Sequence, residues 1–423
     1  MRILVALNPE KTFFNYLAPL AWALRTAGHE VRVASQPRLA DTITQGGLTA
    51  VPVGRDRDPW RVTARTPEKR GELRAGIAPP YDAFDEPERA TWDYLSTGMT
   101  AAVAGWHRLT NFPMITDLVE FARRWQPDLV IWEPLCYAGS IAAKACGAAH
   151  ARLLWGIDVF GVTRDHFLRR KAQQPREEQV DPLADWLAGY ARKYDFDFSE
   201  DMITGNFTID QLPDSLRAEA GLEYVLMQYI PYGGAAVVPG WLQEPPKRPR
   251  VALTMGMSAT ERFDGYNVPF PEIIQSLSTL DIELVATVAE SEQHKITNVP
   301  DNVRIVSYVP WHALVPTCSA VIHHAGAATL ATTARHPVPQ LSLHYHFDQP
   351  FLAHRLTEQG AGLEIHTTEA TGENITDAVR RLLTEPSFGH RAAALRDEML
   401  ALPTPNEIVG RLEELTTKHR TSV

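Results

Sequence analysis

The sequence predicts an α/β protein of two doubly wound parallel-sheet domains that face each other across a cleft. Its 423 residues exceed one typical domain and suit two of about 200 residues each. Short apolar runs alternate with helical patterns in both halves, which is typical of parallel sheets. The stretch 239–250 separates the halves, because its four prolines in twelve residues exclude regular structure.

The first half opens with an apolar run, 2–7, that has the pattern of a buried strand. The helical pattern of 16–27 follows and ends at Gly28, before the next apolar run. The expected strands are 2–7, 30–34, 128–132 and 151–155, and the expected helices are 16–27, 114–125 and 139–145. Two charged stretches, 56–88 and 165–211, are predicted to be insertions over the sheet.

The second half repeats this alternation and predicts a second Rossmann-like domain. The expected strands are 251–255, 283–287, 303–308, 320–323 and 340–343, and the expected helices are 273–280 and 329–335. A last helical pattern, 407–418, has no strand after it, and we expect it to cross back to the first domain. The predicted units are an N-terminal domain, 1–238 with 406–423, a linker, 239–250, and a C-terminal domain, 251–405.

Composition excludes several classes of function. The formal net charge is −10 without a long basic run, which argues against a nucleic-acid surface. No segment approaches the roughly 18 uncharged apolar residues of a membrane span. Lys11 interrupts the apolar N-terminus, so we expect no signal peptide. Three cysteines without disulfide or zinc spacing fit a reducing cytoplasm.

The turn 324–329 has the composition of an anion site. It reads HAGAAT, so phosphate oxygens could approach the backbone at the start of the next helix. A tight connection that needs small residues only for packing is the alternative. Asp348 and Gln349 close the next strand, and a carboxylate beside an amide suits sugar hydroxyls. A helix N-cap is the alternative for this pair.

Several stretches together resemble a known family. They are LAPLAWALRTAGHEVRVAS, PDLVIWEP, ARLLWG, YVPWHALVPTCSAVIHHAGAAT and the closing DQP. Along essentially its whole length the chain resembles the GT-B glycosyltransferases of actinomycete natural-product pathways. It is most similar to the macrolide and anthracycline deoxysugar transferases that work with a cytochrome P450-like auxiliary protein.

The resemblance implies the reaction and its partners. The donor is a TDP-deoxysugar, the acceptor is a hydrophobic polyketide-type aglycone, and transfer usually inverts the anomeric carbon. The N-terminal domain binds the acceptor and the C-terminal domain binds the nucleotide sugar, with no cofactor. The protein partner is the P450-like auxiliary protein, and assembly is left open between a monomer and a homodimer.

The resemblance also implies a donor site. His324 faces the diphosphate, helped by backbone N–H groups of the turn and the Thr329 hydroxyl, while Tyr308 stacks on the base. The expected donor-binding residues are Gly256, Ser258, Tyr308, Val309, His324, Gly326, Ala327, Ala328, Thr329, Asp348 and Gln349. A core tyrosine and a plain loop serine are the alternatives for Tyr308 and Ser258.

The chain departs from the family at its usual general base. Many relatives carry a histidine where this chain has Phe13, and phenylalanine cannot accept a proton. His29 is expected at the opposite end of the sheet from the cleft. We therefore expect Glu133, or secondly Asp158, to act as the catalytic base. A solvated carboxylate or a helix cap is the alternative for each.

Glycines of the family pattern are also replaced. Ala325 and Ala328 stand where glycines are expected, and His336 replaces a turn glycine. We expect both alanines to keep negative φ, because alanine is strained in the left-handed conformation.

The acceptor is expected to lie against side chains of the first domain. They are Phe13, Phe14, Asn15 and Trp132. We expect no metal, because His344 and His346 alone make a weak site. The rival reading is a noncatalytic GT-B homologue that serves a partner enzyme, and a sugar-nucleotide epimerase fits less well.

Overall fold

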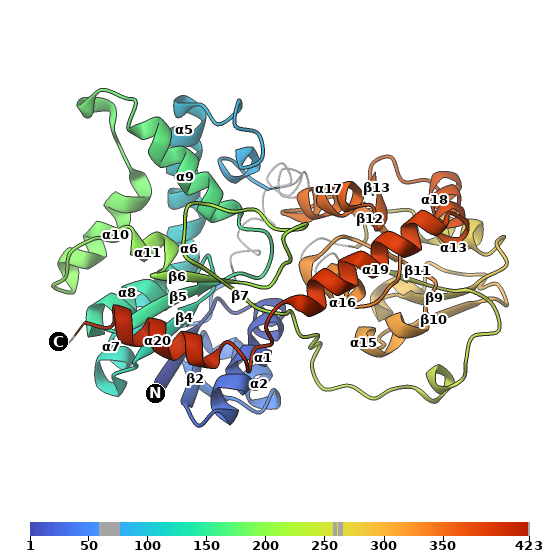
Figure 1. Cartoon of the computed structure of the whole chain (residues 1–423), viewed down its shortest axis with the longest axis horizontal. Coiled ribbons are helices and arrows are strands. Elements are labelled where there is room, and N and C mark those ends of the chain that lie inside the picture. The colour runs from blue at the N-terminus through green and yellow to red at the C-terminus, as the bar shows by residue number, and fades with distance from the viewer. Residues whose placement is uncertain (59–76, 257–259, 261–264, 422–423) are drawn as a thin grey trace.

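The computed structural model describes residues 1–58, 77–256, 260 and 265–421. It has two lobes, each built on one parallel β-sheet with helices around it (Figure 1). These are the two Rossmann-like domains that the sequence predicts, so the predicted α/β fold is confirmed.

The first sheet has seven strands, and the order in which they follow one another along the chain reverses between β1 and β4. Its order is β3-β2-β1-β4-β5-β6-β7, with β1 at Arg2–Ala6, β2 at Glu30–Ser35, β3 at Thr49–Pro52, β4 at Leu129–Trp132, β5 at Ala149–Leu153, β6 at Phe207–Asp210 and β7 at Tyr224–Leu226. The pairings are parallel, and Ile3 of β1 lies between Val31 and Leu129. Connections leave β1 and β4 toward opposite edges, so a crevice forms at their carboxyl ends.

Helices surround this sheet, and α5 and α9 stand together above it in Figure 1. The helices are α1 (Lys11–Thr26), α2 (Ala40–Gln45), α5 (Trp92–Ala102), α6 (Arg108–Asn111), α7 (Ile115–Trp125), α8 (Tyr137–Cys146), α9 (Val159–Lys171), α10 (Pro182–Lys193) and α11 (Asp201–Thr204), with shorter turns at Pro37–Leu39, Tyr81–Ala83 and Arg176–Glu178 and a π-helical turn at Val103–His107. Helix α1 begins earlier than predicted. Phe13, Phe14 and Asn15 therefore lie in its first turns.

The second sheet has six strands, and the order in which they follow one another along the chain reverses between β8 and β11. Its order is β10-β9-β8-β11-β12-β13, with β8 at Arg250–Thr254, β9 at Glu283–Thr287, β10 at Val303–Val306, β11 at Ala320–His323, β12 at Gln340–His344 and β13 at Gly362–His366. The switch point therefore lies where Gly256 follows β8 and His324 follows β11.

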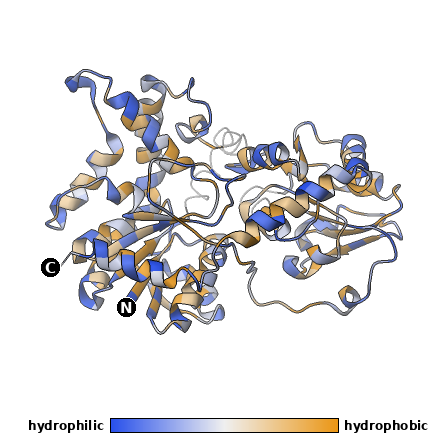
Figure 2. Ribbon diagram, in the orientation of Figure 1, coloured by the Kyte–Doolittle hydropathy of each residue, from blue (hydrophilic) through white to orange (hydrophobic). Residues whose placement is uncertain are grey.

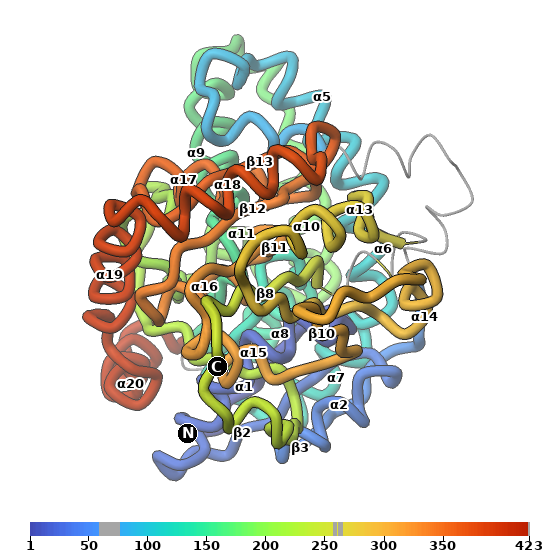
Figure 3. Tube along the Cα trace, turned by 90° about the vertical axis from the view of Figure 1, so that its right-hand side faces the viewer, coloured from blue at the N-terminus to red at the C-terminus, as the bar shows by residue number. Residues whose placement is uncertain are grey.

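The helices of the second half include a pair that leads back to the first domain. They are α13 (Phe270–Leu277), α14 (Glu290–Gln293), α15 (Trp311–Leu314), α16 (Ala327–Ala334), α17 (Gln349–Gln359), α18 (Gly372–Thr384), α19 (Pro386–Ala401) and α20 (Val409–His419), with a short turn at Val315–Thr317. Figures 1 and 3 show α19 and α20 following one side of the molecule. Helix α20 packs on β5 and buries Leu412 and Leu415, which confirms the predicted crossing.

The chain passes between the domains twice, and the two passages are bonded to each other. Gln228, just after β7, donates its side-chain amide to the carbonyls of Leu400 (2.9 Å) and Leu402 (2.6 Å). Its backbone N–H donates to the carbonyl of Pro403 (2.8 Å). The outgoing and returning segments therefore lie side by side.

The structure differs from the predicted elements in several places. Phe207–Asp210 falls in the stretch expected to be an insertion, yet it forms β6 inside the sheet. The edge strands of the two sheets at Thr49–Pro52, Tyr224–Leu226 and Gly362–His366 are not among the expected strands either. The linker also contains a 3₁₀ turn, Gly240–Gln243, and its last residue, Arg250, begins β8. Part of the other predicted insertion, 59–76, lies outside the described residues.

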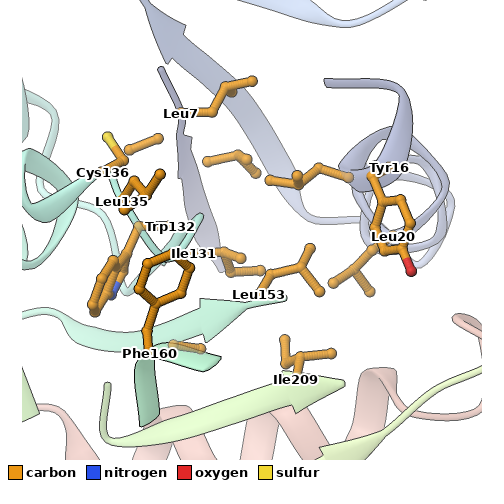
Figure 4. Close-up of a cluster of buried hydrophobic side chains, with 14 of the residues drawn as sticks. Leu7, Tyr16, Leu20, Ile131, Trp132, Leu135, Cys136, Leu153, Phe160 and Ile209 are labelled. Atoms are coloured by element: carbon orange, nitrogen blue, oxygen red, sulfur yellow. The ribbon is translucent and has the colours of Figure 1, made fainter. Parts of the chain in front are cut away.

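Part of the core of the first domain lies between the sheet and α1. In Figure 4, Ile131, Leu153 and Ile209 point from neighbouring strands toward Leu20 of α1. Figure 2 shows the same distribution, with hydrophobic strands inside and hydrophilic outer faces on the helices. Within the described part of the chain, no helix is both long and apolar enough to cross a membrane.

Candidate active site

A cavity of about 1090 Å³ lies between the domains, where the carboxyl ends of both sheets meet. Asn8, after β1, and Leu135, after β4, line it from the first domain. Gly256 and His324 line it from the second domain. Both topological switch points therefore open into one cavity, which is the usual ligand position in such sheets.

The His324 ring is enclosed by two glycines. A Cβ atom at Gly256 would lie 2.6 Å from Cε1 of His324, and one at Gly326 would lie 2.3 Å from Nε2. Gly256 also has a φ of +68°, which side chains rarely adopt. Any larger residue at either position would displace the imidazole, so both glycines are needed to place it.

The environment of His324 suits a bound anion. Burial, with smaller contributions from His323 and His346, lowers the pKa of His324 to about 3. Its Nδ1 has no hydrogen-bond partner among the described residues. Helix α16 begins directly after Gly326 without a side-chain cap, so its first N–H groups face the same space. A neutral imidazole and a helix N-terminus thus meet at one point.

The expectation that Ala325 keeps negative φ is wrong. Its φ is +59°, while Ala328 lies inside α16 with helical geometry. The Ala325 N–H donates to Nδ1 of His323 (2.9 Å), and Nε2 of His323 bonds Oε1 of Gln340 (2.7 Å). This buried chain of hydrogen bonds holds the turn against a left-handed strain of about 1–2 kcal/mol. His336 does not have positive φ.

Asp348 and Gln349 face the cavity and have different partners. Oε1 of Gln349 accepts from the backbone N–H groups of Tyr345 (3.3 Å) and His346 (3.2 Å). Asp348 sits at the N-cap position of α17, but its side chain makes no capping bond, so the helix-cap alternative does not hold. Its Oδ2 has no hydrogen-bond partner among the described residues, and burial raises the pKa of Asp348 to about 7.

The expected base-binding residues also line the cavity. Tyr308 is 48% exposed there, so it is not a core tyrosine, and Val309 lies beside it. The remaining expected residues Ala327, Ala328 and Thr329 line the same cavity. Ser258 lies outside the described residues.

Comparison with known proteins identifies the family. The model described as "Erythromycin biosynthesis protein CIII-like, N-terminal domain" matches residues 22–256, and its C-terminal counterpart matches 271–415. The chain belongs to this family. It is 48% identical to the 10-deoxymethynolide desosaminyltransferase of Streptomyces venezuelae, over 99% of this chain and 98% of that relative. It is 40% identical to the erythronolide mycarosyltransferase of Saccharopolyspora erythraea, over 99% and 100%.

Solved structures of GT-B glycosyltransferases have the same fold as this chain. The glycosyltransferase VinC in complex with dTDP superposes with a TM-score of 0.89 at 37% identity, over 99% of this chain and 100% of that one. The spinosyn forosaminyltransferase SpnP gives a TM-score of 0.83 at 35% identity, over 99% of each chain. This chain is therefore a GT-B glycosyltransferase.

The expected acceptor residues separate into two groups. Phe13 and Asn15 line the cavity. Phe14 is 1% exposed and Trp132 is fully buried, so both are core residues, contrary to expectation. Figure 4 shows Trp132 inside the hydrophobic cluster. Because consecutive residues of α1 point in different directions, only part of the 13–15 run can face the ligand.

Glu133 lies behind the cavity wall rather than in it. It is fully buried and accepts from Nδ2 of Asn8 (2.7 Å), the backbone N–H of Leu135 (2.9 Å) and Nε1 of Trp155 (3.0 Å). Burial raises its pKa, although these donors favour the ionised form. Its three partners line the cavity and Glu133 does not. Glu133 therefore binds three residues of the cavity wall without lining the cavity itself.

Asp158 is a structural residue. Its side chain caps α9 by accepting from the Gly161 N–H (2.9 Å), and it pairs with Arg152 (2.5 Å) and Tyr224 (2.8 Å). It is fully buried and does not line the cavity. The expectation of a catalytic base at Asp158 is therefore wrong, and the helix-cap alternative is correct. His29 binds the N-terminal amine, far from the carboxyl ends of the strands, as expected.

An aromatic wall consists of Phe13, Trp155, Phe160 and Phe347, and of these four residues the sequence predicted only Phe13. Trp155 stacks on Phe13 with ring centroids 4.6 Å apart and contacts Phe160 and Phe347 at 6.2 and 5.4 Å. All four rings line the cavity, and Phe347 comes from the second domain. A signal existed for Trp155, which ends the predicted strand 151–155. None existed for Phe347, because its contact depends on how the domains meet.

Proposed function

We propose that this GT-B glycosyltransferase transfers a deoxysugar from a TDP-linked donor to a polyketide-type aglycone in antibiotic biosynthesis, with inversion at the anomeric carbon. The observation that carries the proposal is the glycine-enclosed His324 at the start of α16, beside Asp348, in the interdomain cavity. Relatives that share nearly the full length of the chain include desosaminyl and mycarosyl transferases.

The two domains take different parts in the proposed reaction. Residues 251–405 bind the donor, with Tyr308 on the base, His324 on the diphosphate and Asp348 on the sugar. Residues 1–238 with 406–423 bind the acceptor against Phe13 and the rest of the aromatic wall. Because phenylalanine stands at the usual position of the base, the proton of the acceptor leaves to another group of the cavity or to solvent.

Calorimetric titration with TDP and UDP tests the donor site. We expect TDP to bind more tightly, and His324→Ala to weaken TDP binding by about 10- to 100-fold, because it removes a hydrogen bond to a charged group. His354→Ala is the matched control, since that histidine is exposed on α17 outside the cavity. Absence of binding to either nucleotide would favour the noncatalytic reading. Turnover is tested with TDP-desosamine and 10-deoxymethynolide.

We propose further that transfer needs no metal ion or other cofactor. His324 and the N–H groups of α16 supply the electrostatic stabilisation that a departing diphosphate needs. In the described ranges, no group of three or more His, Cys, Asp or Glu side chains is placed to hold a metal ion. EDTA is therefore expected to leave turnover unchanged. Loss of turnover with EDTA and recovery with a divalent ion would contradict this.

The remaining proposals rest on the resemblance and on the cysteines. We place the enzyme in the cytoplasm, in accord with three free cysteines, Cys136, Cys146 and Cys318. A P450-like auxiliary protein and a second copy of the chain are the proposed protein partners. Light scattering of the purified chain, alone and with such a protein, measures both associations.

A further inference from the structure

Phe347 has a backbone conformation that its side chain does not favour. It lies in the loop between β12 and α17 with a φ of +53°. A bulky residue in the left-handed region is strained, and such strain persists only where surrounding structure holds it. The strain points to a function for the contacts that hold this residue.

Those contacts come from the other domain. The Phe347 ring lies 5.4 Å from the ring of Trp155 and 6.2 Å from that of Phe160. Trp155 is fixed in turn, because it stacks on Phe13 and its indole N–H donates to the buried carboxylate of Glu133 (3.0 Å). Aromatic rings of the first domain, Trp155 and Phe160, therefore hold a strained residue of the second domain.

The next residue, Asp348, also lies against the first domain. A Cβ atom at Gly156 would lie 2.1 Å from Oδ2 of Asp348, so only glycine at 156 permits this approach. The backbone N–H of Ile157 faces the same carboxyl group. Oδ2 has no hydrogen-bond partner among the described residues, although Asp348 is only 7% exposed. Segments 155–157 and 347–348 thus form one interdomain contact.

We propose that Phe347 is a positioning residue that couples acceptor binding to recognition of the donor's sugar. An apolar aglycone that packs on Phe13 and Trp155 steadies the rings that hold Phe347, and Phe347 fixes the loop that carries Asp348. Coupling between two binding sites is reciprocal, so the aglycone then raises the affinity for the sugar-bearing donor. The inference rests on the proposed function, because it takes Asp348 as the residue that binds the sugar.

Calorimetry with TDP-desosamine and with TDP separates sugar recognition from nucleotide recognition. For Phe347→Leu we expect the TDP-desosamine affinity to fall about three- to tenfold, as expected for loss of an aromatic contact. The TDP affinity should stay within about twofold, since TDP lacks the sugar that Asp348 binds. Phe347→Asn should behave like the leucine variant although asparagine tolerates positive φ. Phe347→Tyr keeps the aromatic ring and should restore the wild-type ratio of TDP-desosamine affinity to TDP affinity.

Phe351→Leu is the matched control. Phe351 also makes an aromatic contact across the domains, 4.4 Å from Phe84, but neither residue lines the cavity. Addition of 10-deoxymethynolide should raise the TDP-desosamine affinity of the wild type and of this control, and not that of Phe347→Leu.

Three results would overturn the inference. Equal losses for TDP and TDP-desosamine in Phe347→Leu would show a general structural defect. Unchanged affinities for both would show that the ring positions nothing. Loss of the aglycone effect in Phe351→Leu would show that any interdomain contact carries the coupling. Failure of the wild type to bind TDP at all would instead refute the proposed donor site, on which this inference rests.

Discussion

Asp348→Asn is expected to raise the free energy of unfolding by up to about 4 kcal/mol at pH 8, because the folded protein holds this carboxyl group with a pKa near 7. Burial raises this pKa, so between pH 4 and 7 the folded state binds a proton that the unfolded state has lost. Stability of the wild type therefore falls as pH rises through this window and levels off above it. Asparagine removes that dependence.

Urea unfolding at pH 4 to 8 measures the effect. The stability difference between Asp348→Asn and the wild type should be close to zero at pH 4 and grow up to pH 7. Asp210→Asn is the control, because burial raises the pKa of Asp210 to about 7 and this residue does not line the cavity. Both variants should be stabilised, but only Asp348→Asn should lose turnover, by about 10- to 100-fold. A stability difference between Asp348→Asn and the wild type that does not depend on pH would contradict the raised pKa of Asp348.

Asp158→Ala is expected to destabilise the fold by about 3–5 kcal/mol, because it leaves a buried guanidinium without its anion. Arg152 is 1% exposed, and among the described residues the Thr208 hydroxyl is the acceptor that remains for its side chain. The change also removes the cap of α9. Thermal and urea unfolding measure this cost directly.

Asp165→Ala provides the comparison, since Asp165 pairs with Arg169 on the same helix at the surface. Its expected cost is below about 1 kcal/mol. Asp158→Asn keeps the oxygen that caps α9, so its loss of stability should lie between those of Asp158→Ala and Asp165→Ala. Normal stability of Asp158→Ala together with lost turnover would restore Asp158 as a catalytic residue and contradict its structural role.

The sequence predicted the two sheets because their central strands are continuous apolar runs. Strand β6 was missed because its residues, FTID, are half polar and follow a long charged stretch. Its Thr208 and Asp210 are nevertheless buried, because their side chains accept hydrogen bonds from Arg152 and from the Leu212 N–H. No local sequence pattern reveals these bonds. The start of α1 was placed too late because Glu10 makes no side-chain cap and Pro19 lies inside the helix.

Some residues of the candidate site could likewise be placed from the sequence, and others could not. His324 and Asp348 could be placed because they follow strands at the carboxyl edge of one sheet. The burial of Trp132 and the enclosure of Glu133 depend on which face of the strand end each side chain takes. The contact of Phe347 with Trp155 depends on the relative placement of two domains, which short-range periodicity does not specify. The left-handed φ of Ala325 depends on the buried bonds of His323.

The bonds of Gln228 to the returning segment at 400–403 also bear on how the two domains can move. Because both passages between the domains are joined at one edge, we expect the domains to rotate about this edge as a hinge rather than to slide past each other. Rotation of a few backbone torsions near residues 228 and 400–403 would be sufficient for such a movement.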